Sequence, residues 1–164
     1  MRELTSADIF ALHDQLEEKA ATLLGRILFA FSRLEMELGL CVVWVDRGTR
    51  LEQLTDEHEE AGFNARLSSL RKSVDERLSK GSERHSAYSD WIDNADDVRQ
   101  VRNELVHGRW GVEATEERIV NVLGLPTSQK QRSVSYSLEQ LQQVYEKLGL
   151  LLTGLGTLRQ KWPL

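Results

Sequence analysis

The residues best suited to chemistry are an arginine and a histidine that stand five positions apart in the segment RNELVHG, residues 102–108. The guanidinium of Arg102 can hold a phosphate group through a rigid fork of N–H donors. The imidazole of His107 can transfer a proton near neutral pH. Together they offer charge stabilisation and acid–base transfer, the two contributions that phosphodiester cleavage without a metal ion requires.

The pattern of apolar residues predicts four long helices around this pair. Apolar side chains recur every three or four positions along residues 5–46, 63–78, 83–107 and 137–161, which is the spacing of one helix face. The candidate pair falls at the end of the third helix. Gly108 follows directly and is typical of a helix end.

Capping residues mark three of the predicted helix starts. Thr5, Ser82 and Ser137 precede the first, third and fourth helix, and each can accept a hydrogen bond from a backbone N–H of the first turn. Ser137 with Gln140 three residues later has the pattern of a capping box. A break of the first helix near Gly25 is left open by the sequence.

The segments between the helices predict one loop and one hairpin. Residues 52–62 are acidic and are predicted to form a loop. Residues 119–123 and 133–136 are rich in β-branched residues, and Gly, Pro and Ser separate them, which predicts a β-hairpin. The predicted fold is therefore all-α: an up-and-down bundle of about four main helices with a small β-hairpin between the third and fourth, in a single domain over residues 1–164.

Two charged residues are predicted to lie on apolar helix faces. On a helical wheel centred on Trp91, Arg102 falls at about 20°, inside the apolar stripe of its helix. On a wheel centred on Phe31, Glu35 falls at about 40°, also inside the stripe. A charge in such a place needs a partner, a cleft or an interface. We expect Glu35 and Arg102 to pair, either as a structural ion pair or so that Glu35 orients Arg102 towards a functional cleft.

His107 does not share the helix face of Arg102. It falls at about 160° on the same wheel, whereas Asn103 and His107, four positions apart, do share a face. The arginine and the histidine can meet where the last turn opens at Gly108, or across a two-fold dimer that joins two helix ends. The alternative to a catalytic role is that His107 is only a favourable cation at the negative end of the helix dipole.

Composition and charge restrict the class of protein. Forty per cent apolar and 29% charged residues are typical of a soluble globular chain, and the net charge of -5 argues against a broad basic surface that coats nucleic acid, although not against a local basic cleft. Cys41 is the only cysteine, which excludes an internal disulfide, and its apolar neighbours predict a buried core position. Without a signal-peptide pattern or an apolar run long enough to span a bilayer, a cytoplasmic protein with no membrane association is expected.

The motif Arg102-Asn103-x3-His107 resembles the R-x4-H motif of the HEPN superfamily (higher eukaryote and prokaryote nucleotide-binding domains). A polar residue often follows the arginine in that family, and Asn103 matches it. The surrounding pattern V-R-N-x3-H-G-x-W, residues 101–110, and the segment FSRLE, residues 31–35, are similar to a bacterial branch of the superfamily.

The resemblance implies a metal-independent endoribonuclease that needs no cofactor and acts on RNA as a homodimer, with two motifs forming one composite site. Arg102 would hold the scissile phosphate, His107 would act as general acid or base at the ribose 2′-hydroxyl, and Asn103 would orient His107 or bind the phosphate. The products would be a 2′,3′-cyclic phosphate and a 5′-hydroxyl. Arg99 and Arg109 would add positive charge, unless they are ordinary surface residues. A toxin or defence system, in stress response or against phage, is the implied setting.

One departure from the family bears on regulation. A toxin–antitoxin branch carries a tyrosine two positions after the histidine, where this chain has Arg109. An antitoxin that modifies this tyrosine is therefore not expected, and any antitoxin or regulatory partner stays unknown. The alternative function is a non-catalytic interaction or nucleotide-binding module of the same fold, in which Arg102 is structural.

No metal is expected. The carboxylates at positions 93, 96, 97 and 104 are predicted to form a solvated helix face, and the acidic run at residues 56–60 is predicted to be surface. His13 and His85 lack obvious ligand partners in the sequence. Phosphate-binding glycine-rich loops, nucleophile elbows and metalloprotease motifs are absent from the sequence.

Overall fold

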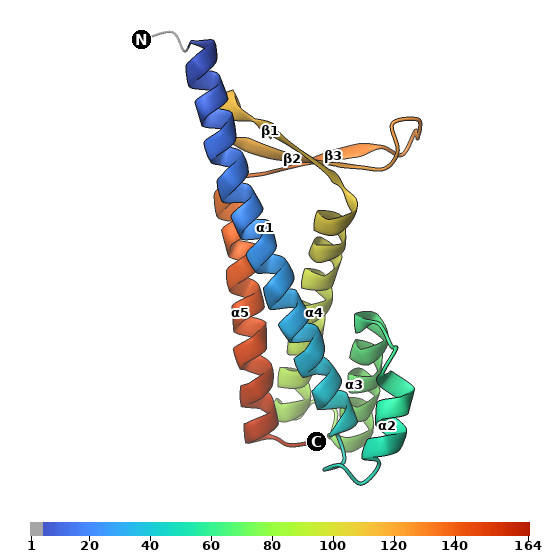
Figure 1. Cartoon of the computed structure of the whole chain (residues 1–164). Helices are drawn as coiled ribbons and strands as arrows, with labels where there is room; N and C mark the ends of the chain where they lie inside the picture. The colour runs from blue at the N-terminus through green and yellow to red at the C-terminus, as the bar shows by residue number, and fades with distance from the viewer. Residues whose placement is uncertain (1–4) are drawn as a thin grey trace. The chain divides into compact units, whose positions relative to one another are not determined.

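The computed structural model describes residues 5–164, which form five α-helices and a small antiparallel sheet (Figure 1). The helices are α1 (Ser6–Val43), α2 (Leu51–His58), α3 (Phe63–Arg77), α4 (Glu83–His107) and α5 (Leu138–Lys161). The strands are β1 (Arg109–Glu113), β2 (Arg118–Leu123) and β3 (Arg132–Tyr136). The prediction of a mainly helical chain is confirmed.

The chain divides into two compact units, and three of the helices contribute to both. The sheet unit contains the described residues up to Phe29 and Val101–Glu146, and so includes all three strands and the end of α4. The helical unit contains Ala30–Gln100 and Lys147–Leu164. The candidate pair at positions 102 and 107 belongs to the sheet unit.

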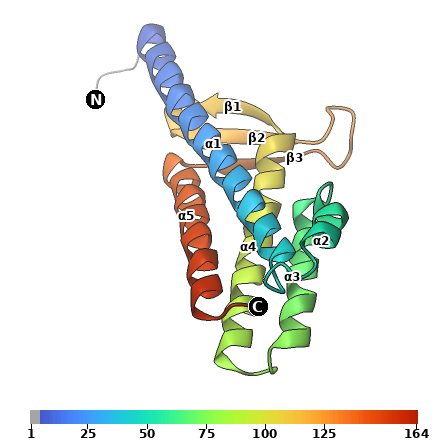
Figure 2. The same cartoon turned by 60° about the horizontal axis from the view of Figure 1, so that its bottom comes forward.

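An apolar core stabilises the helical unit, together with a hydrogen bond from a buried side chain to a backbone carbonyl. Leu34, Leu38, Leu70 and Val74 are buried, and the α2–α3 pair lies side by side in both views (Figures 1 and 2). The indole Nε1 of Trp91 donates a hydrogen bond of 2.9 Å to the carbonyl of residue 151. This hydrogen bond gives the buried indole N–H a partner inside the core, and it fixes how α4 and α5 pack within this unit.

The sheet unit is built on β2, which pairs antiparallel with β1 on one side and β3 on the other. The register aligns Trp110, Asn121 and Val134 on one face of the sheet. Ile119 and Asn121 of β2 are both buried. Their face covers the end of α4, as the hydrogen bonds described below show.

Two elements were missed by the sequence prediction. The acidic segment predicted as a loop contains α2, because Leu54 and His58, four positions apart, are both buried and leave the acidic residues on the outer side. The predicted hairpin has a third strand, β1, which starts one residue after Gly108. Its alternation of exposed and half-buried residues is hidden in the sequence by Arg109 and Gly111.

The C-terminal end of α1 also differs from the prediction. The helix runs without a break through Gly25 and ends at Val43 rather than at Asp46. The chain then tightens into turns, and Arg47 and Gly48 both have positive φ, at 59° and 80°. Left-handed residues cannot continue a right-handed helix, so α1 ends before them.

The predicted capping residues are confirmed. The backbone N–H of Asp8 donates to Thr5 Oγ1 at 3.2 Å, and that of His85 donates to Ser82 Oγ at 3.3 Å. At the start of α5, Ser137 N–H donates to Gln140 Oε1 at 2.8 Å. The Gln140 N–H donates back to Ser137 Oγ at 3.1 Å, which completes the capping box.

Among the helices described, none combines the length and the apolar character that crossing a membrane demands.

Candidate functional site

The sheet holds the end of α4 by capping its carbonyl groups. The amide Nδ2 of Asn121 donates a hydrogen bond of 2.7 Å to the Glu104 carbonyl. The indole Nε1 of Trp110 donates one of 3.0 Å to the Leu105 carbonyl. The last four carbonyls of a helix have no partner inside it, so two of the four are satisfied here by side chains from β1 and β2.

Gly108 lets the sheet approach the helix end. A Cβ atom at this position would lie 1.5 Å from Oδ1 of Asn121 and 2.3 Å from its Cγ. Asn121 is fully buried. Any larger residue at position 108 would therefore push this amide away from the helix end, which explains why the motif is followed by glycine.

Arg102 and Asn103 lie together on the last turns of α4. Both side chains are half-buried, and Nη1 of Arg102 donates a hydrogen bond of 3.2 Å to Oδ1 of Asn103. Asn103 therefore contacts Arg102, whereas the resemblance implied that it orients His107 or binds a phosphate. Its amide restricts the orientation of the guanidinium.

His107 is the last residue of α4, and its side chain is exposed. Within residues 5–164 its imidazole has neither a hydrogen-bond nor an ion-pair partner. Since α4 remains helical to this residue, Arg102 and His107 are separated by about 140° around the helix axis. One protomer therefore presents the two side chains in different directions.

The two supporting arginines differ in their surroundings. Arg109 is exposed on the first residue of β1, opposite Val122 of β2. Arg99 belongs to the helical unit, and its Nε donates to Asp96 Oδ1 at 2.7 Å. The charge of Arg99 is thus compensated locally, while Arg109 keeps its charge exposed beside the motif.

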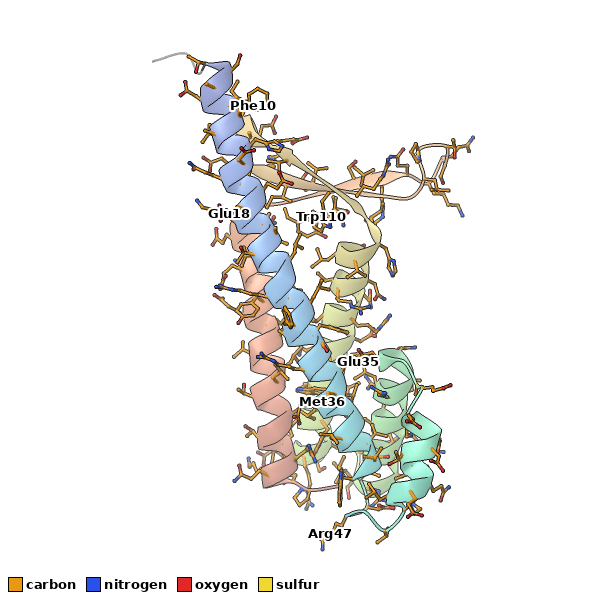
Figure 3. All side chains as sticks on the ribbon, in the orientation of Figure 1. Phe10, Glu18, Glu35, Met36, Arg47 and Trp110 are labelled. Atoms are coloured by element: carbon orange, nitrogen blue, oxygen red, sulfur yellow. The ribbon has the colours of Figure 1, made fainter. Side chains whose placement is uncertain are left out.

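Glu35 lies in the helical unit, and Arg102 lies in the sheet unit. The proposed pairing of these two side chains stays a prediction. The backbone carbonyl of Glu35 accepts a hydrogen bond of 3.4 Å from Arg66 Nη1. Its side chain is half-buried and lines a hollow that is described below (Figure 3).

Several residues that shape the end of α4 were missed from the sequence. Glu104 forms an ion pair with Arg132 of β3. Burial, and next the nearby carboxylate of Glu104, raise the pKa of Tyr136. The ring of Tyr136 packs against Trp110 (labelled in Figure 3), with centroids 5.9 Å apart. The sequence did contain a signal for these contacts, because Glu104 stands inside the motif and both an aromatic residue and an arginine lie on the predicted hairpin.

The carboxylates at positions 93 and 97 of α4 also have basic partners. Asp93 pairs with Arg71 at 2.5 Å, and Asp97 pairs with Lys147 at 3.5 Å. His85 Nε2 lies 2.8 Å from Asp75 Oδ1, and this contact lowers the pKa of Asp75. This partner of His85 lies on α3, ten residues earlier in the sequence, and the two residues are not part of a cluster of three or more metal-binding side chains among the described residues.

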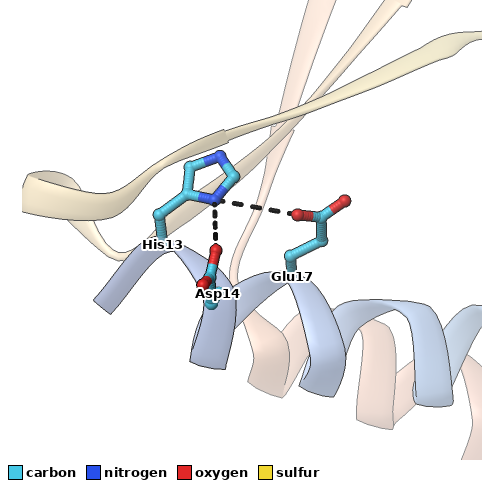
Figure 4. A group of neighbouring side chains, drawn as sticks. All are labelled: His13, Asp14 and Glu17. Carbon is cyan, nitrogen blue, oxygen red and sulfur yellow. Dashed lines mark ion pairs between the residues drawn. The ribbon is translucent and has the colours of Figure 1, made fainter. Parts of the chain in front are cut away.

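His13 also has acidic neighbours that the sequence did not indicate as partners. Its Nδ1 lies 3.5 Å from Asp14 and 3.7 Å from Glu17, and these three residues could together offer ligands to a metal ion (Figure 4). Both carboxylates are mostly exposed. Structural zinc sites close a tetrahedron of four protein ligands, and this exposed group provides three. We therefore interpret it as a surface charge cluster.

Cys41 is a buried core residue, as predicted. Burial raises the pKa of its thiol to about 11, so the thiolate is scarce at neutral pH. This cysteine is not a candidate nucleophile.

No protein-family profile, curated protein or solved structure matches this chain. The geometry of the chain and the motif at the end of α4 are therefore what indicates its function.

Proposed function

We propose that this protein is a metal-independent endoribonuclease of the HEPN type, built on a helical bundle whose candidate site is completed by a second copy of the chain. The observation that supports the proposal is the state of the motif at the end of α4. Arg102 is half-buried and oriented by Asn103, whereas His107 is exposed and has no partner within residues 5–164. A restrained cation and an unengaged imidazole suit phosphate binding and proton transfer.

The separation of Arg102 and His107 by about 140° on one helix makes the second copy part of the proposal. In a two-fold dimer, Arg102 of one protomer can face the partner subunit's His107 across the interface. The candidate site is then composite, and neither protomer holds a complete set of groups alone.

The proposed reaction is a transesterification followed by release. One His107 removes the proton from the ribose 2′-hydroxyl, and the 2′-oxygen forms a bond to phosphorus. The bond from phosphorus to the 5′-oxygen breaks, and that oxygen takes a proton from the solvent, so one Arg102 and one His107 suffice for cleavage. Arg102 stabilises the charge that develops on the phosphoryl oxygens. The products are a 2′,3′-cyclic phosphate and a 5′-hydroxyl.

The caps on α4 reduce an electrostatic obstacle to this proposal. The C-terminal end of a helix carries partial negative charge, which disfavours a phosphate. Asn121 and Trp110 donate N–H groups to two of the exposed carbonyls, and Glu104 is neutralised by Arg132. Arg109, exposed beside this end, adds a positive charge. The local surface therefore repels an anion less than an uncapped helix C-terminus would.

The alternative is a non-catalytic module of the same fold. The half-burial of Arg102 favours it, since a structural role explains a charge that is held by a neighbouring side chain. The catalytic and the non-catalytic proposals predict different results when His107 is replaced. An exposed His107 that is only a surface residue can be replaced without loss of function, whereas a catalytic one cannot.

The test is RNA cleavage in EDTA by the intact chain and by the variants Arg102→Ala and His107→Ala. Matched controls are Arg33→Ala and His13→Ala, which remove the same residue types from exposed or half-exposed positions outside the motif. We expect cleavage by the intact chain and both controls, loss in both motif variants, and cyclic phosphate ends by mass spectrometry. Absence of cleavage by the intact chain, or equal cleavage by the motif variants, would reject the proposal.

Mixing the two inactive variants tests the composite site. A heterodimer of Arg102→Ala with His107→Ala retains one intact Arg102 and the partner subunit's intact His107, so partial activity should return. A motif that acts within one protomer gives no recovery. Light scattering on the same mixtures measures whether dimers form.

A further inference from the structure

A hollow in the helical unit is unrelated to the motif on α4. It has a volume of about 680 Å³ and lies between the C-terminal half of α1 and the connection from α2 to α3. Glu35 and Met36 of α1, labelled in Figure 3, line it together with the end of α2. Ligand sites in proteins are commonly hollows of roughly 300–1,000 Å³.

The charge in this hollow is unbalanced. Glu35, Glu59 and Glu60 line it, and none of these three carboxylates forms an ion pair inside the described helical unit. The only lining guanidinium is that of Arg66. Its N–H groups donate to the backbone carbonyls of residues 35, 58 and 59, at 3.4, 3.1 and 3.2 Å, rather than to a carboxylate.

His58 adds an unsatisfied acceptor to the wall. Its side chain is only 7% exposed, and Nδ1 has no hydrogen-bond partner in the described part of the chain. Its other nitrogen, Nε2, lies 4.0 Å from the carboxylate of Glu57, which is too long for a hydrogen bond. In the tautomer that carries its proton on Nε2, Nδ1 is an acceptor, and the group that would satisfy it is an N–H donor.

The floor of the hollow is apolar. Met36, Leu40 and Val43 line it from successive turns of α1, and the first two are 57% and 41% exposed. The C-terminal end of α2, at His58, adds the negative end of a helix dipole. The hollow therefore combines an apolar floor, an acidic rim and one buried acceptor.

We propose that this hollow binds an organic cation with an alkyl stem, such as a primary amine or a guanidine. The ammonium or guanidinium group contacts the carboxylates of Glu35, Glu59 and Glu60 and donates to His58 Nδ1 after a small rotation of the imidazole. The alkyl stem covers Met36 and Leu40. The proposal is independent of RNA cleavage, because the hollow lies in the helical unit and the motif lies in the sheet unit.

The test is a titration followed by nuclear magnetic resonance on the full-length protein. Hexylammonium is the probe, and hexanoate, with the same stem and the opposite charge, is the matched ligand control. We expect saturable shifts at millimolar hexylammonium in the His58 ring and in the lining residues of α1. Hexanoate should leave these signals unchanged. Equal binding of both ligands, or no saturable shift with hexylammonium, would overturn the proposal.

Two variants separate binding from folding. Glu35→Gln with Glu59→Gln and Glu60→Gln should weaken hexylammonium binding by about tenfold or more, since each neutralised carboxylate removes an attraction to the cation. A control triple, Glu52→Gln with Asp56→Asn and Glu76→Gln, removes the same charge outside the hollow and should bind as the intact chain does.

Met36→Lys offers a second route if the triple variant does not fold. The position is mostly exposed, so a lysine is tolerated, and its ammonium group repels the ligand from the floor. We expect it to abolish the shifts at His58 while the circular dichroism spectrum stays unchanged. Unchanged binding in this folded variant would contradict the proposed location of the alkyl stem.

Discussion

Replacing Gly108 by alanine tests how the sheet holds the end of α4. The new Cβ would lie 1.5 Å from Asn121 Oδ1, whereas ordinary van der Waals contact begins at 3.4 Å. Asn121 and the helix end must therefore separate by about 2 Å, which is enough to break the 2.7 Å hydrogen bond to the Glu104 carbonyl. Since Asn121 is fully buried, water cannot replace that bond.

The expected loss is about 2–4 kcal/mol in the free energy of unfolding. A buried amide left without its partner costs about 1–3 kcal/mol. Overpacking of a filled site costs about 1–3 kcal/mol more, and relaxation of the strand makes the two losses overlap. The φ of Gly108 is not in the left-handed region, so the clash alone causes the effect.

Urea denaturation followed by circular dichroism measures this change, and amide hydrogen exchange locates it. The matched control is Gly111→Ala on β1, where a Cβ meets nothing within 4 Å. The control should stay within about 0.5 kcal/mol of the intact chain. Faster exchange in Gly108→Ala should be confined to the end of α4 and to the strands.

A double-mutant cycle with Asn121→Ala decides whether the clash is the cause. Without the amide, alanine at position 108 has room, so the cost of Gly108→Ala should fall by more than about 1 kcal/mol. If Gly108→Ala is as mild as Gly111→Ala, or if its cost is the same with and without Asn121, the account of the helix end is refuted.

Three further predictions concern ionisable groups and buried polar contacts. Because burial raises the pKa of the Cys41 thiol to about 11, we expect a disulfide reagent to label it slowly at neutral pH and rapidly in urea; fast labelling of the folded chain would contradict its burial. The hydrogen bond from Arg50 lowers the pKa of Asp46 from 3.8 to about 2, so its stabilising contribution is present above about pH 4 and is lost as the pH falls towards 2. In Arg50→Ala, a carboxyl titration by magnetic resonance should place this pKa near 3.8 again, and an unchanged value would exclude Arg50 as the cause. Tyr88→Phe removes the 2.9 Å hydrogen bond to the Trp162 carbonyl and should lower the free energy of unfolding by about 1 kcal/mol, measured in urea; no change would mean that the hydroxyl adds nothing to stability.

Local signals in the sequence were sufficient for most of the helices. The start of α5 was predicted because Ser137 and Gln140 cap each other within one turn, and the structure confirms both hydrogen bonds. The end of α4 was predicted at Gly108 for a different reason. In the sequence Gly108 was taken as a residue typical of a helix end, whereas the structure needs glycine because Asn121 approaches it closely.

The missed elements depend on contacts with residues outside the elements themselves. β1 has weak strand propensity, with Gly111 and two charged residues, and it exists because all five of its residues pair with β2. The short helix α2 is likewise secured by Arg66 of α3, whose guanidinium donates hydrogen bonds to the carbonyls of residues 58 and 59 at the end of α2. Each partner lies outside the segment whose own residue pattern was used to predict that element.

The candidate site was predictable in its residue types but not in their orientation. The motif identified Arg102 and His107, and the helical wheel separated them. The hydrogen bond from Arg102 to Asn103 follows from rotamers that a wheel does not describe. The caps from Asn121 and Trp110 require the register of β2 with β1, which the missed strand concealed.

These caps also favour one of the two ways in which Arg102 and His107 can meet. For the two side chains to converge within one protomer, the last turn of α4 must unwind, which moves the Glu104 and Leu105 carbonyls away from Asn121 and Trp110. Each of these two hydrogen bonds contributes about 0.5–1.5 kcal/mol, and the buried amide nitrogen of Asn121 would lose its hydrogen bond to the Glu104 carbonyl. A second copy of the chain supplies the missing group without this cost. We therefore expect the mixture of Arg102→Ala with His107→Ala to recover activity, and Gly108→Ala, which loosens the last turn, to lower cleavage by the intact motif rather than raise it.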